Sequence, residues 1–448
     1  MRVLHVVHGY SPESAGGVET YLADLVRAQR ALGLEVHLLA GSMRPWPRCG
    51  IEHELVDGVE VTRLHRDDLF FDWHAKAWHP GVEALFLQVL ARVRPDVVHV
   101  HHWIRLTANL VELAQGAGYP TLVTLHDVYT SCPRAFRVDR AGDPCARALS
   151  PANCLDCVPR YGHESAEELL EGIALFAEHT RSEILRAAAV LTPNEAPAGF
   201  LAQALGLPVT AFRVLPLPFT PRLPARLPGG RMPRADEPLR LAYFGRLARH
   251  KGVGVLVDAF VALSQEGTPR AVELHLFGEP DRDYDKELRV RAGAAPVIFH
   301  GAYEPADLAS AQLHCAVFPT LAVETHGYVL DEAFELGLPV VVSDLGAVAR
   351  RAGGAAVRVP PGDVEAWQSA LHRLVADPEV LRALAAHIPP PPPTVAAHTE
   401  SLRAIYEDVR ARPGPRDAAG VDPKRRAAFL LMQRESALRQ ITPPGGPH

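Results

Sequence analysis

Two basic side chains follow a buried strand near the middle of the chain. Arg246 and Lys251 lie in the segment GRLARHKG (245–252), directly after a predicted strand at 239–244. Arginine offers a planar fork and lysine a compact point charge, so the pair suits a diphosphate. Lysine is rare in this chain, which contains only four. Its use here favours a chemical role, although a solvated surface lysine remains the alternative.

Two glutamates, separated by seven residues, lie in a second loop and the helix that follows it. Glu324 lies in the loop after a predicted strand at 315–318, and Glu332 lies in a predicted helix at 328–336. Apolar residues follow Glu332, so its carboxylate can face a cleft. A purely structural interpretation would place Glu324 on the helix dipole and Glu332 on a solvated face.

A glycine-containing loop follows the first predicted strand, at 3–7. Gly16 and Gly17 end this loop where a helical pattern begins. Free amides and the helix dipole favour an anion at such a position, although a flexible turn is the alternative. The spacing is not that of a dinucleotide-binding fingerprint, which counts against a dehydrogenase.

Strands and helices alternate along two successive stretches of similar length, which predicts two doubly wound α/β domains with a ligand cleft between them. We expect an N-terminal domain (1–216) with a cysteine-rich insertion near 130–160, a linker (217–238), a second domain (239–388), a polyproline spacer (389–395), a helix packing back on the N-terminal domain (396–412) and a basic tail (413–448). We expect the tail to be partly ordered, in preference to a membrane-surface helix.

Bulk composition narrows the class of protein. The chain has 448 residues, 48% hydrophobic and 22% charged, which is typical of globular domains. A net charge of −6 argues against a nucleic-acid partner. His5 and His8 interrupt the apolar N-terminus, and no apolar run of about 18 residues occurs. We therefore expect a cytoplasmic protein, with peripheral contact at the inner membrane face as a possibility left open.

Four cysteines fall within the predicted insertion. Cys132, Cys145, Cys154 and Cys157 end in a CxxC pair, which in a reducing compartment favours a closed, structural zinc site. Incidental thiols are the alternative. The histidines at 99, 101 and 102 have no carboxylate or cysteine partner at ligand spacing, so we interpret them as core and cleft-lining residues.

With these motifs the chain resembles a retaining glycosyltransferase of family four, which has the GT-B architecture of two facing Rossmann-like domains. The resemblance covers about residues 1–410, and it implies that the first domain (1–216) is the acceptor side and the second (239–388) binds the nucleotide-sugar. Its most specific marks are the Glu324–Glu332 spacing with Gly327 between, and the GR-x4-KG run at 245–252. GGVE at 16–19, PDVVHVH at 95–101 and VPPGD at 359–363 add support.

The resemblance implies a role for each candidate in holding the donor. Arg246 and Lys251 would bind the diphosphate and stabilise the leaving phosphate, and the amides of Gly16 and Gly17 would approach the same group. Glu332 would accept hydrogen bonds from the ribose.

Other candidates would contact the transferred sugar. Glu324 would bind its hydroxyls near the reacting carbon, and His126 would touch it from the first domain.

The loop after Glu324 would contribute to phosphate binding, because the backbone amides of Thr325, His326 and Gly327 would add to the phosphate contacts. At His326 the sequence departs from the commonest pattern, which has an aromatic or apolar residue there.

The implied enzyme transfers a hexosyl group from a nucleoside-diphosphate-sugar to an acceptor hydroxyl with retention. The acceptor would be a lipid-linked glycan, a small metabolite or a protein. Preorganised cations and amides would stabilise the departing diphosphate, so catalysis would need no cofactor or divalent metal. Two rival functions remain open: a sugar-nucleotide epimerase of the same architecture, and a catalytically silent nucleotide-sugar-binding subunit.

Overall fold

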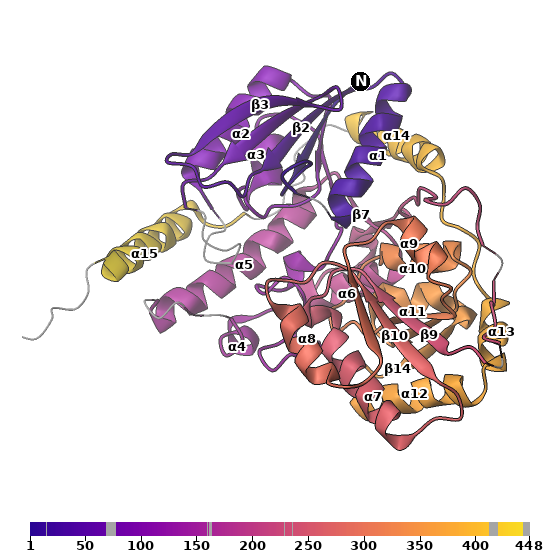
Figure 1. Cartoon of the computed structure of the whole chain (residues 1–448). Coiled ribbons are helices and arrows are strands. Elements are labelled where there is room, and N and C mark those ends of the chain that lie inside the picture. Colours follow the sequence, from indigo (N-terminus) through magenta and orange to yellow (C-terminus); the bar gives the residue numbers. More distant parts are fainter. Residues whose placement is uncertain are drawn as a thin grey trace, which may run out of the picture. The chain divides into compact units, whose positions relative to one another are not determined.

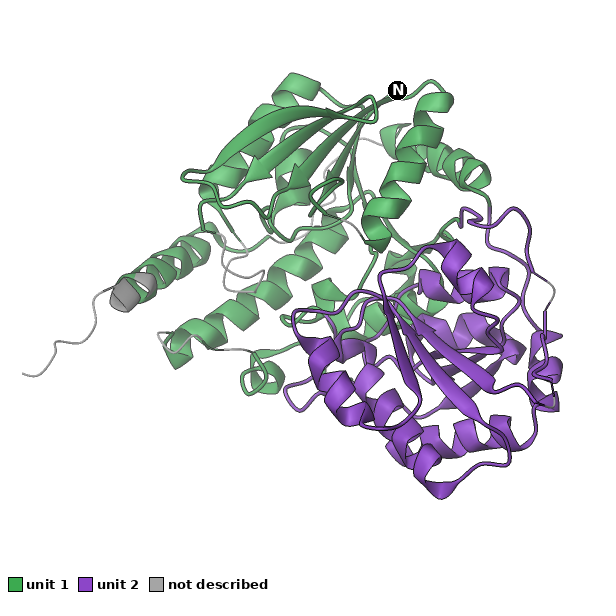
Figure 2. Cartoon of the chain, viewed as in Figure 1, with its two compact units in different colours: residues 1–135, 146–218, 394–448 green, residues 136–145, 219–393 purple. Residues whose placement is uncertain are grey.

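The computed structural model describes residues 1–14, 16–68, 78–158, 160, 164–227, 229–234, 236–411 and 420–441. The chain divides into two compact units, shown in two colours in Figure 2. Unit 1 comprises residues 1–135, 146–218 and 394–448, and unit 2 comprises residues 136–145 and 219–393. Each unit has its own β-sheet and hydrophobic core.

The sheet of unit 1 has the strand order β3-β4-β2-β1-β5-β6-β7-β8, and β3 alone among them pairs in antiparallel fashion, with β4. Its strands are β1 (Arg2–Val7), β2 (Glu35–Gly41), β3 (Gly50–Val56), β4 (Val59–His65), β5 (Val97–Val100), β6 (Thr121–Thr124), β7 (Ala189–Thr192) and β8 (Arg213–Val214). Its helices are α1 (Gly17–Ala31), α2 (Pro80–Val93), α3 (Leu110–Gly116), α4 (Pro151–Cys154), α5 (Ala166–Arg186), α6 (Glu195–Leu205), α14 (Val395–Ala411) and α15 (Pro423–Ile441). Apolar runs in β1 and β5 are buried on both faces, as a parallel sheet covered by helices requires.

The sheet of unit 2 is parallel throughout, with the order β11-β10-β9-β12-β13-β14 (Figure 1). Its strands are β9 (Leu239–Phe244), β10 (Val272–Phe277), β11 (Val297–Gly301), β12 (Cys315–Phe318), β13 (Val340–Ser343) and β14 (Ala356–Val359). Its helices are α7 (Val253–Glu266), α8 (Tyr284–Ala292), α9 (Pro305–Ser310), α10 (Tyr328–Glu335), α11 (Gly346–Ala352), α12 (Val364–Ala376) and α13 (Glu379–Ala385). The strand order reverses between β9 and β12, so the loops after these strands flank a topological switch point, where doubly wound folds bind ligands.

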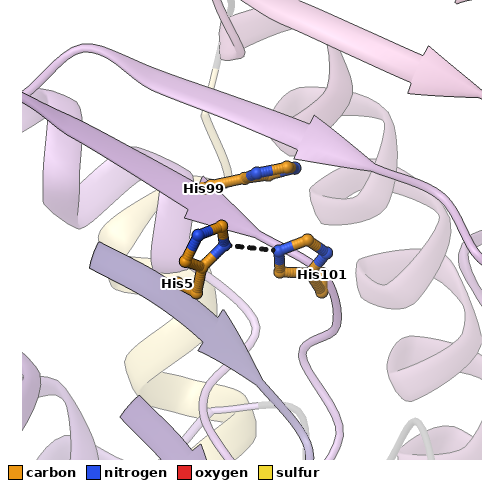
Figure 3. A group of neighbouring side chains, drawn as sticks. All are labelled: His5, His99 and His101. Atoms are coloured by element: carbon orange, nitrogen blue, oxygen red, sulfur yellow. Dashed lines mark hydrogen bonds between the residues drawn. The ribbon is translucent and has the colours of Figure 1, made fainter. Parts of the chain in front are cut away.

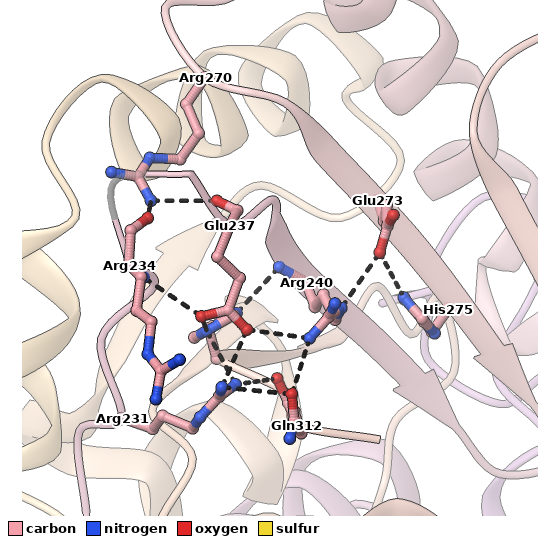
Figure 4. A network of polar contacts seen from close by, with 9 residues as sticks. Arg231, Arg234, Glu237, Arg240, Arg270, Glu273, His275 and Gln312 are labelled. Atoms are coloured by element: carbon pink, nitrogen blue, oxygen red, sulfur yellow. Dashed lines mark hydrogen bonds and ion pairs between the residues drawn. The ribbon is translucent and has the colours of Figure 1, made fainter.

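An ionic network fastens the segment before β9 to the base of the unit 2 sheet (Figure 4). The carboxylate of Glu237 accepts hydrogen bonds from Arg231 and Arg240 at 2.8 and 3.0 Å. Arg240 also contacts Glu273 at 3.2 Å, and Arg270 donates to the carbonyls of Arg234 and Glu237 at 2.6 and 3.2 Å. The end of the expected linker is therefore held against the sheet.

Two C-terminal helices pack on unit 1. Helix α14 contacts α1, and α15 contacts α5. Arg425 of α15 forms ion pairs with Glu171 and Glu178 of α5, while Phe429 is buried beside Trp78. These contacts hold residues 420–441 of the expected tail, and the rest of it, 413–419 and 442–448, lies outside the described residues. No described helix is both long enough and apolar enough to cross a membrane.

A buried carboxylate joins α5 to the start of α3. Glu183 accepts hydrogen bonds from the indole N–H of Trp103 at 2.9 Å and from the amides of Val111 and Glu112 at 2.7 and 2.9 Å. Burial raises the pKa of Glu183 to about 7, although these three donors oppose the rise. The side chain thus satisfies a helix terminus that would otherwise be buried without acceptors.

We predict that Glu183→Ala lowers the free energy of unfolding by about 3 kcal/mol, because it leaves three N–H groups without an acceptor. Glu178→Ala is the matched control on the same helix. Its partly exposed pair with Arg425 should contribute less than about 1 kcal/mol. Urea unfolding of the two variants measures the difference, and equal losses would contradict the assigned role of Glu183.

Candidate functional site

The loops after β9 and β12 pack against each other in unit 2. The carbonyl of His250 accepts hydrogen bonds from the amides of Leu321 and Ala322 at 3.0 and 3.1 Å. Gly252 has φ 72°, and a Cβ there would lie 1.9 Å from the carbonyl oxygen of Pro319. Any side chain at 252 would therefore push the two loops apart.

An ion pair joins these two loops. The ammonium of Lys251 contacts the carboxylate of Glu324, and both side chains are partly buried. Arg246, on the same loop as Lys251, is 65% exposed and lies 3.3 Å from Asp281. Two of the predicted site residues, Lys251 and Glu324, are thus brought into direct contact, with a second cation on the same loop.

The loop carrying Glu324 is fixed through its backbone. The carbonyl of Glu324 accepts a hydrogen bond from the amide of Ala347 at 3.0 Å. A Cβ on Gly346 would lie 2.9 Å from that carbonyl oxygen, so the start of α11 approaches the loop closely. Gly327, with φ 76°, then turns the chain into α10.

A pair formed by the partly buried Arg351 and the buried Asp331 supports the same loop. Arg351 donates to the carbonyls of His326 and Gly327 at 2.9 and 3.4 Å, and its other guanidinium nitrogen lies 2.5 Å from Asp331. The second carboxylate oxygen of Asp331 lies 3.1 Å from Nε2 of His326. Because their carbonyls are held by Arg351, residues 326 and 327 have a fixed peptide orientation.

Burial shifts the pKa of two further groups in unit 2. It lowers the pKa of His326, an effect that the neighbouring Asp331 opposes. It raises the pKa of Glu332, whose carboxylate accepts a hydrogen bond from the hydroxyl of Tyr303 at 3.2 Å. The charge of Arg222 opposes this rise. Thr325, in the loop that carries Glu324, is also buried.

The remaining predicted residues of the donor site lie in unit 1. Gly16 caps the start of α1, and Gly17 is its first residue. A Cβ on Gly16 would lie 2.9 Å from the carboxylate of Glu19, which also accepts a hydrogen bond from Ser14 at 2.6 Å. His126 follows β6, is half-buried, and bonds through Nε2 to Nδ1 of His101 at 2.9 Å.

The four predicted zinc ligands are distributed over both units. Cys132, Cys154 and Cys157 belong to unit 1, and Cys145 belongs to unit 2. A tetrahedral site needs four ligands at about 2.3 Å from one ion. The zinc site stays a prediction from the spacing of the four cysteines. Among the described residues, the groups with at least three possible ligand atoms within 4.8 Å are others: His5 with His99 and His101 (Figure 3), and Asp67 with Asp68 and His79.

Sequence reasoning missed the residues that hold the loops in place. Asp331 and Arg351 are separated by 20 positions on different helices, and Tyr303 comes from the loop after β11. One signal was available for the first of these, because Asp331 directly precedes Glu332 within an otherwise apolar helix start. Nothing in the sequence links Arg351 to the loop that it supports.

Comparison with known proteins gives the family. The model described as "Glycosyl transferase 4-like domain" matches residues 16–154, and the model described as "Glycosyl transferases group 1" matches residues 238–377. Together they span more than half of the chain. The chain belongs to glycosyltransferase family four. The prediction of the family and of the GT-B fold class is thereby confirmed.

Relatives and solved structures agree with this assignment. The glycosyltransferase is 26% identical over 427 residues to a D-inositol 3-phosphate glycosyltransferase of Streptomyces griseus, covering 88% of this chain and 83% of the relative. It is 27% identical over 386 residues to a phosphatidyl-myo-inositol mannosyltransferase of Mycobacterium leprae, covering 83% of this chain and 87% of that relative. Sucrose-phosphate synthase from Thermosynechococcus elongatus shares the fold with a TM-score of 0.64 and 20% identity, covering 92% of this chain and all of that one. The structure of Anabaena HepE in complex with UDP and glucose has a TM-score of 0.57 and 17% sequence identity, covering 91% of this chain and all of HepE.

We predict that Arg351→Met lowers the free energy of unfolding of this glycosyltransferase by about 3 kcal/mol, because it leaves the buried carboxylate of Asp331 without its cation. Arg350→Met, at the neighbouring exposed position, is the control and should change stability by less than about 0.5 kcal/mol. Urea unfolding compares the two. If both variants lose less than about 0.5 kcal/mol of unfolding free energy, the buried carboxylate of Asp331 does not need the charge of Arg351.

Proposed function

We propose that the chain transfers a sugar from a nucleoside-diphosphate-sugar to an acceptor hydroxyl with retention of configuration. The observation that carries the proposal is the contact between Lys251 and Glu324 at the switch point of unit 2, with Arg246 on the same loop. In this proposal the two cations would bind the diphosphate, and the adjacent carboxylate would bind a polar sugar. Each group lies at the carboxyl end of a strand, where the fold binds ligands.

The charges of the site match those that develop during transfer. Breaking the glycosidic bond builds negative charge on the diphosphate and positive charge on the sugar. Lys251 and Arg246 would stabilise the first, and Glu324 the second. The cations are held before the reaction, Lys251 by Glu324 and Arg246 by Asp281, so little reorganisation would be needed. These groups would supply the required stabilisation without a divalent metal.

The comparisons support a choice of donor and acceptor to test first. One similar solved structure contains UDP and glucose, and another, named as trehalose-6-phosphate from E. coli, is bound with UDP-2-fluoro glucose. A UDP-sugar is therefore the first donor that we propose. The relatives from Streptomyces and Mycobacterium are named for inositol 3-phosphate and phosphatidyl-myo-inositol, so we propose a phosphorylated inositol as acceptor class.

The two rival functions receive less support than transfer. The two matched family models and both relatives named above are glycosyltransferases. A silent binding subunit would have no need for a carboxylate held beside the phosphate cations. Analysis of products from a labelled UDP-sugar separates the three functions, because an epimerase converts the free donor and a silent subunit leaves it unchanged.

We predict that Arg246→Ala and Lys251→Ala each weaken binding of UDP by at least about tenfold, since each removes a charge-assisted contact of about 1.5–3 kcal/mol. Arg249→Ala is the matched control on the same loop, because the exposed Arg249 pairs instead with Glu287. Calorimetric titration with UDP gives the affinities. Unchanged affinity in both test variants would refute the assignment of the diphosphate site.

The two glutamates should differ in their kinetic effects. Glu324→Gln should lower kcat strongly and leave UDP binding nearly intact, since charge develops on the sugar only in the transition state. Glu332→Gln should chiefly raise the donor KM, because bonding at the ribose changes little during transfer. Steady-state kinetics with the donor found by screening tests both, and an active Glu324→Gln enzyme or reversed effects would disprove the proposed roles.

A further inference from the structure

One carboxylate of the candidate site in unit 2 is only half satisfied by the protein. Glu332 lies in α10, and its Oε2 accepts a hydrogen bond from the hydroxyl of Tyr303 at 3.2 Å. Within the described part of the chain, no group donates a hydrogen bond to its Oε1. The side chain is partly buried, and carboxylate oxygens withdrawn from water are normally hydrogen-bonded. The free oxygen therefore points to a ligand that carries a donor.

The hydroxyl that holds Oε2 belongs to a ring with little freedom. Tyr303 lies between β11 and α9, and its ring meets Phe244 and Phe277 edge to face, with centroids 6.3 and 6.1 Å apart. The chain directly after it is fixed by the start of α9, where the amide of Glu304 donates to the carboxylate of Asp307 at 2.8 Å. Because ring and loop are both held, the phenol defines where one carboxylate oxygen can lie.

The direction of the bond follows from the charge of the carboxyl group. Burial raises the pKa of Tyr303, so the phenol keeps its proton. An ionised carboxylate only accepts, and the phenol must then be the donor. Burial also raises the pKa of Glu332, and the negative charges of Asp331 and Glu335 add to that rise. The charge of Arg222 and the bond from Tyr303 oppose it, so the phenol helps to keep the carboxylate ionised.

A neighbouring glutamate shows what a structural carboxylate looks like on the same helix. Glu335 is buried, and its Oε1 accepts hydrogen bonds from the amides of Arg222 and Leu223 at 2.8 and 2.9 Å. These bonds tie the segment before β9 to α10. Glu332 has no such backbone partner; its one donor is the phenol, which leaves the second oxygen available. The contrast favours binding over mere support of the fold.

We propose that Tyr303 is a positioning residue for the donor, whose hydroxyl holds Oε2 of Glu332 so that the carboxylate presents Oε1 to the ribose hydroxyls of the nucleotide. The inference rests on the proposed function, which assigns the ribose to Glu332, and deepens it by naming the residue that fixes this carboxylate. Tyr303 itself does not need to touch the nucleotide. A nucleotide without ribose hydroxyls gains nothing from the arrangement, because it has no donor for Oε1.

The first test is calorimetric titration of the full chain with UDP and with 2′,3′-dideoxy-UDP. The parent should bind UDP more tightly than the dideoxy nucleotide. Tyr303→Phe keeps the ring and removes only the hydroxyl. It should weaken UDP about three- to tenfold, as the loss of one hydrogen bond implies, and leave the affinity for the dideoxy nucleotide within about twofold of the parent. Equal weakening of both nucleotides would show a structural role and overturn the inference.

Tyr119→Phe is the matched control. Tyr119 is also partly buried, and its hydroxyl donates to the carbonyl of Leu90 at 3.2 Å, the same distance as in the pair under test. This tyrosine lies in unit 1, so the variant removes a comparable bond without touching Glu332. It should bind both nucleotides as the parent does.

The second test needs no nucleotide. Carbon-13 spectroscopy of the chain labelled at the glutamate carboxyl gives the pKa of Glu332, with the signal assigned by its loss in Glu332→Gln. In Tyr303→Phe this pKa should rise, because the variant removes a donor to the ionised form while Arg222, Asp331 and Glu335 remain. An unchanged pKa would overturn the inference. So would a carboxyl that is protonated at pH 7 in the parent, because it would need no donor.

The nucleotide titrations also separate this inference from the proposed function. A parent that binds neither nucleotide, or binds both equally, would refute the ribose contact of Glu332 on which the inference rests. A parent that prefers UDP, together with a Tyr303→Phe variant that keeps the whole preference, would leave that contact standing and refute the role of Tyr303 alone. In transfer assays Tyr303→Phe should raise the donor KM and leave kcat near that of the parent, since ribose bonding changes little during the reaction.

Discussion

Backbone crowding at the carboxyl ends of β9, β10 and β12 is the constraint on which the candidate site of unit 2 depends. A Cβ on Gly252 would meet the carbonyl oxygen of Pro319 at 1.9 Å, and one on Gly278 would meet that of Gly245 at 1.8 Å. These contacts fix the separation of the loops. The side chains of Lys251 and Glu324 therefore form their ion pair from loops whose backbones have little room to move, and the backbone orients their charges.

Unit 1 orients the buried side chains of His5, His99 and His101 by hydrogen bonds between neutral groups, and not by ion pairs. Its contribution consists of neutral, buried rings whose hydrogen bonds each have a defined partner, from Gln29 through His5 to His101. A charged core of this size would be unstable, because desolvation penalises the imidazolium form. Unit 2 thus offers charged side chains on closely packed loops, and unit 1 offers hydrogen bonds between buried neutral rings.

The sequence predicted what depends on local pattern. Alternating strands and helices gave the fold class, and the residues of the ion pair, Lys251 and Glu324, were each singled out by spacing. Their contact was not foreseen, since it joins loops 73 positions apart. The hairpin β3–β4 was also missed, although Asp57 and Gly58, both with positive φ, form a turn pair typical of hairpins.

Contacts between distant segments lie beyond what local pattern reveals. Helix α15 is held by the ion pairs of Arg425 with Glu171 and Glu178, which the composition of the tail does not reveal. The histidines were interpreted as core lining, which their burial supports, whereas their hydrogen bonds to Gln29 and Tyr406 join segments far apart in the sequence. The zinc site stays a prediction from cysteine spacing, because spacing carries no information on the unit to which each thiol belongs.

The return of α14 to unit 1 also affects the order in which the protein can mature on the ribosome. The chain leaves unit 1 at residue 218 and re-enters it at 394, after all of the main segment of unit 2 has been synthesised. Until then Gln29, His99 and Tyr21 lack the bonds that Tyr406 and His398 supply. The nascent first unit therefore carries unsatisfied polar groups in its interior while the second is being translated, and its final packing is necessarily a late event.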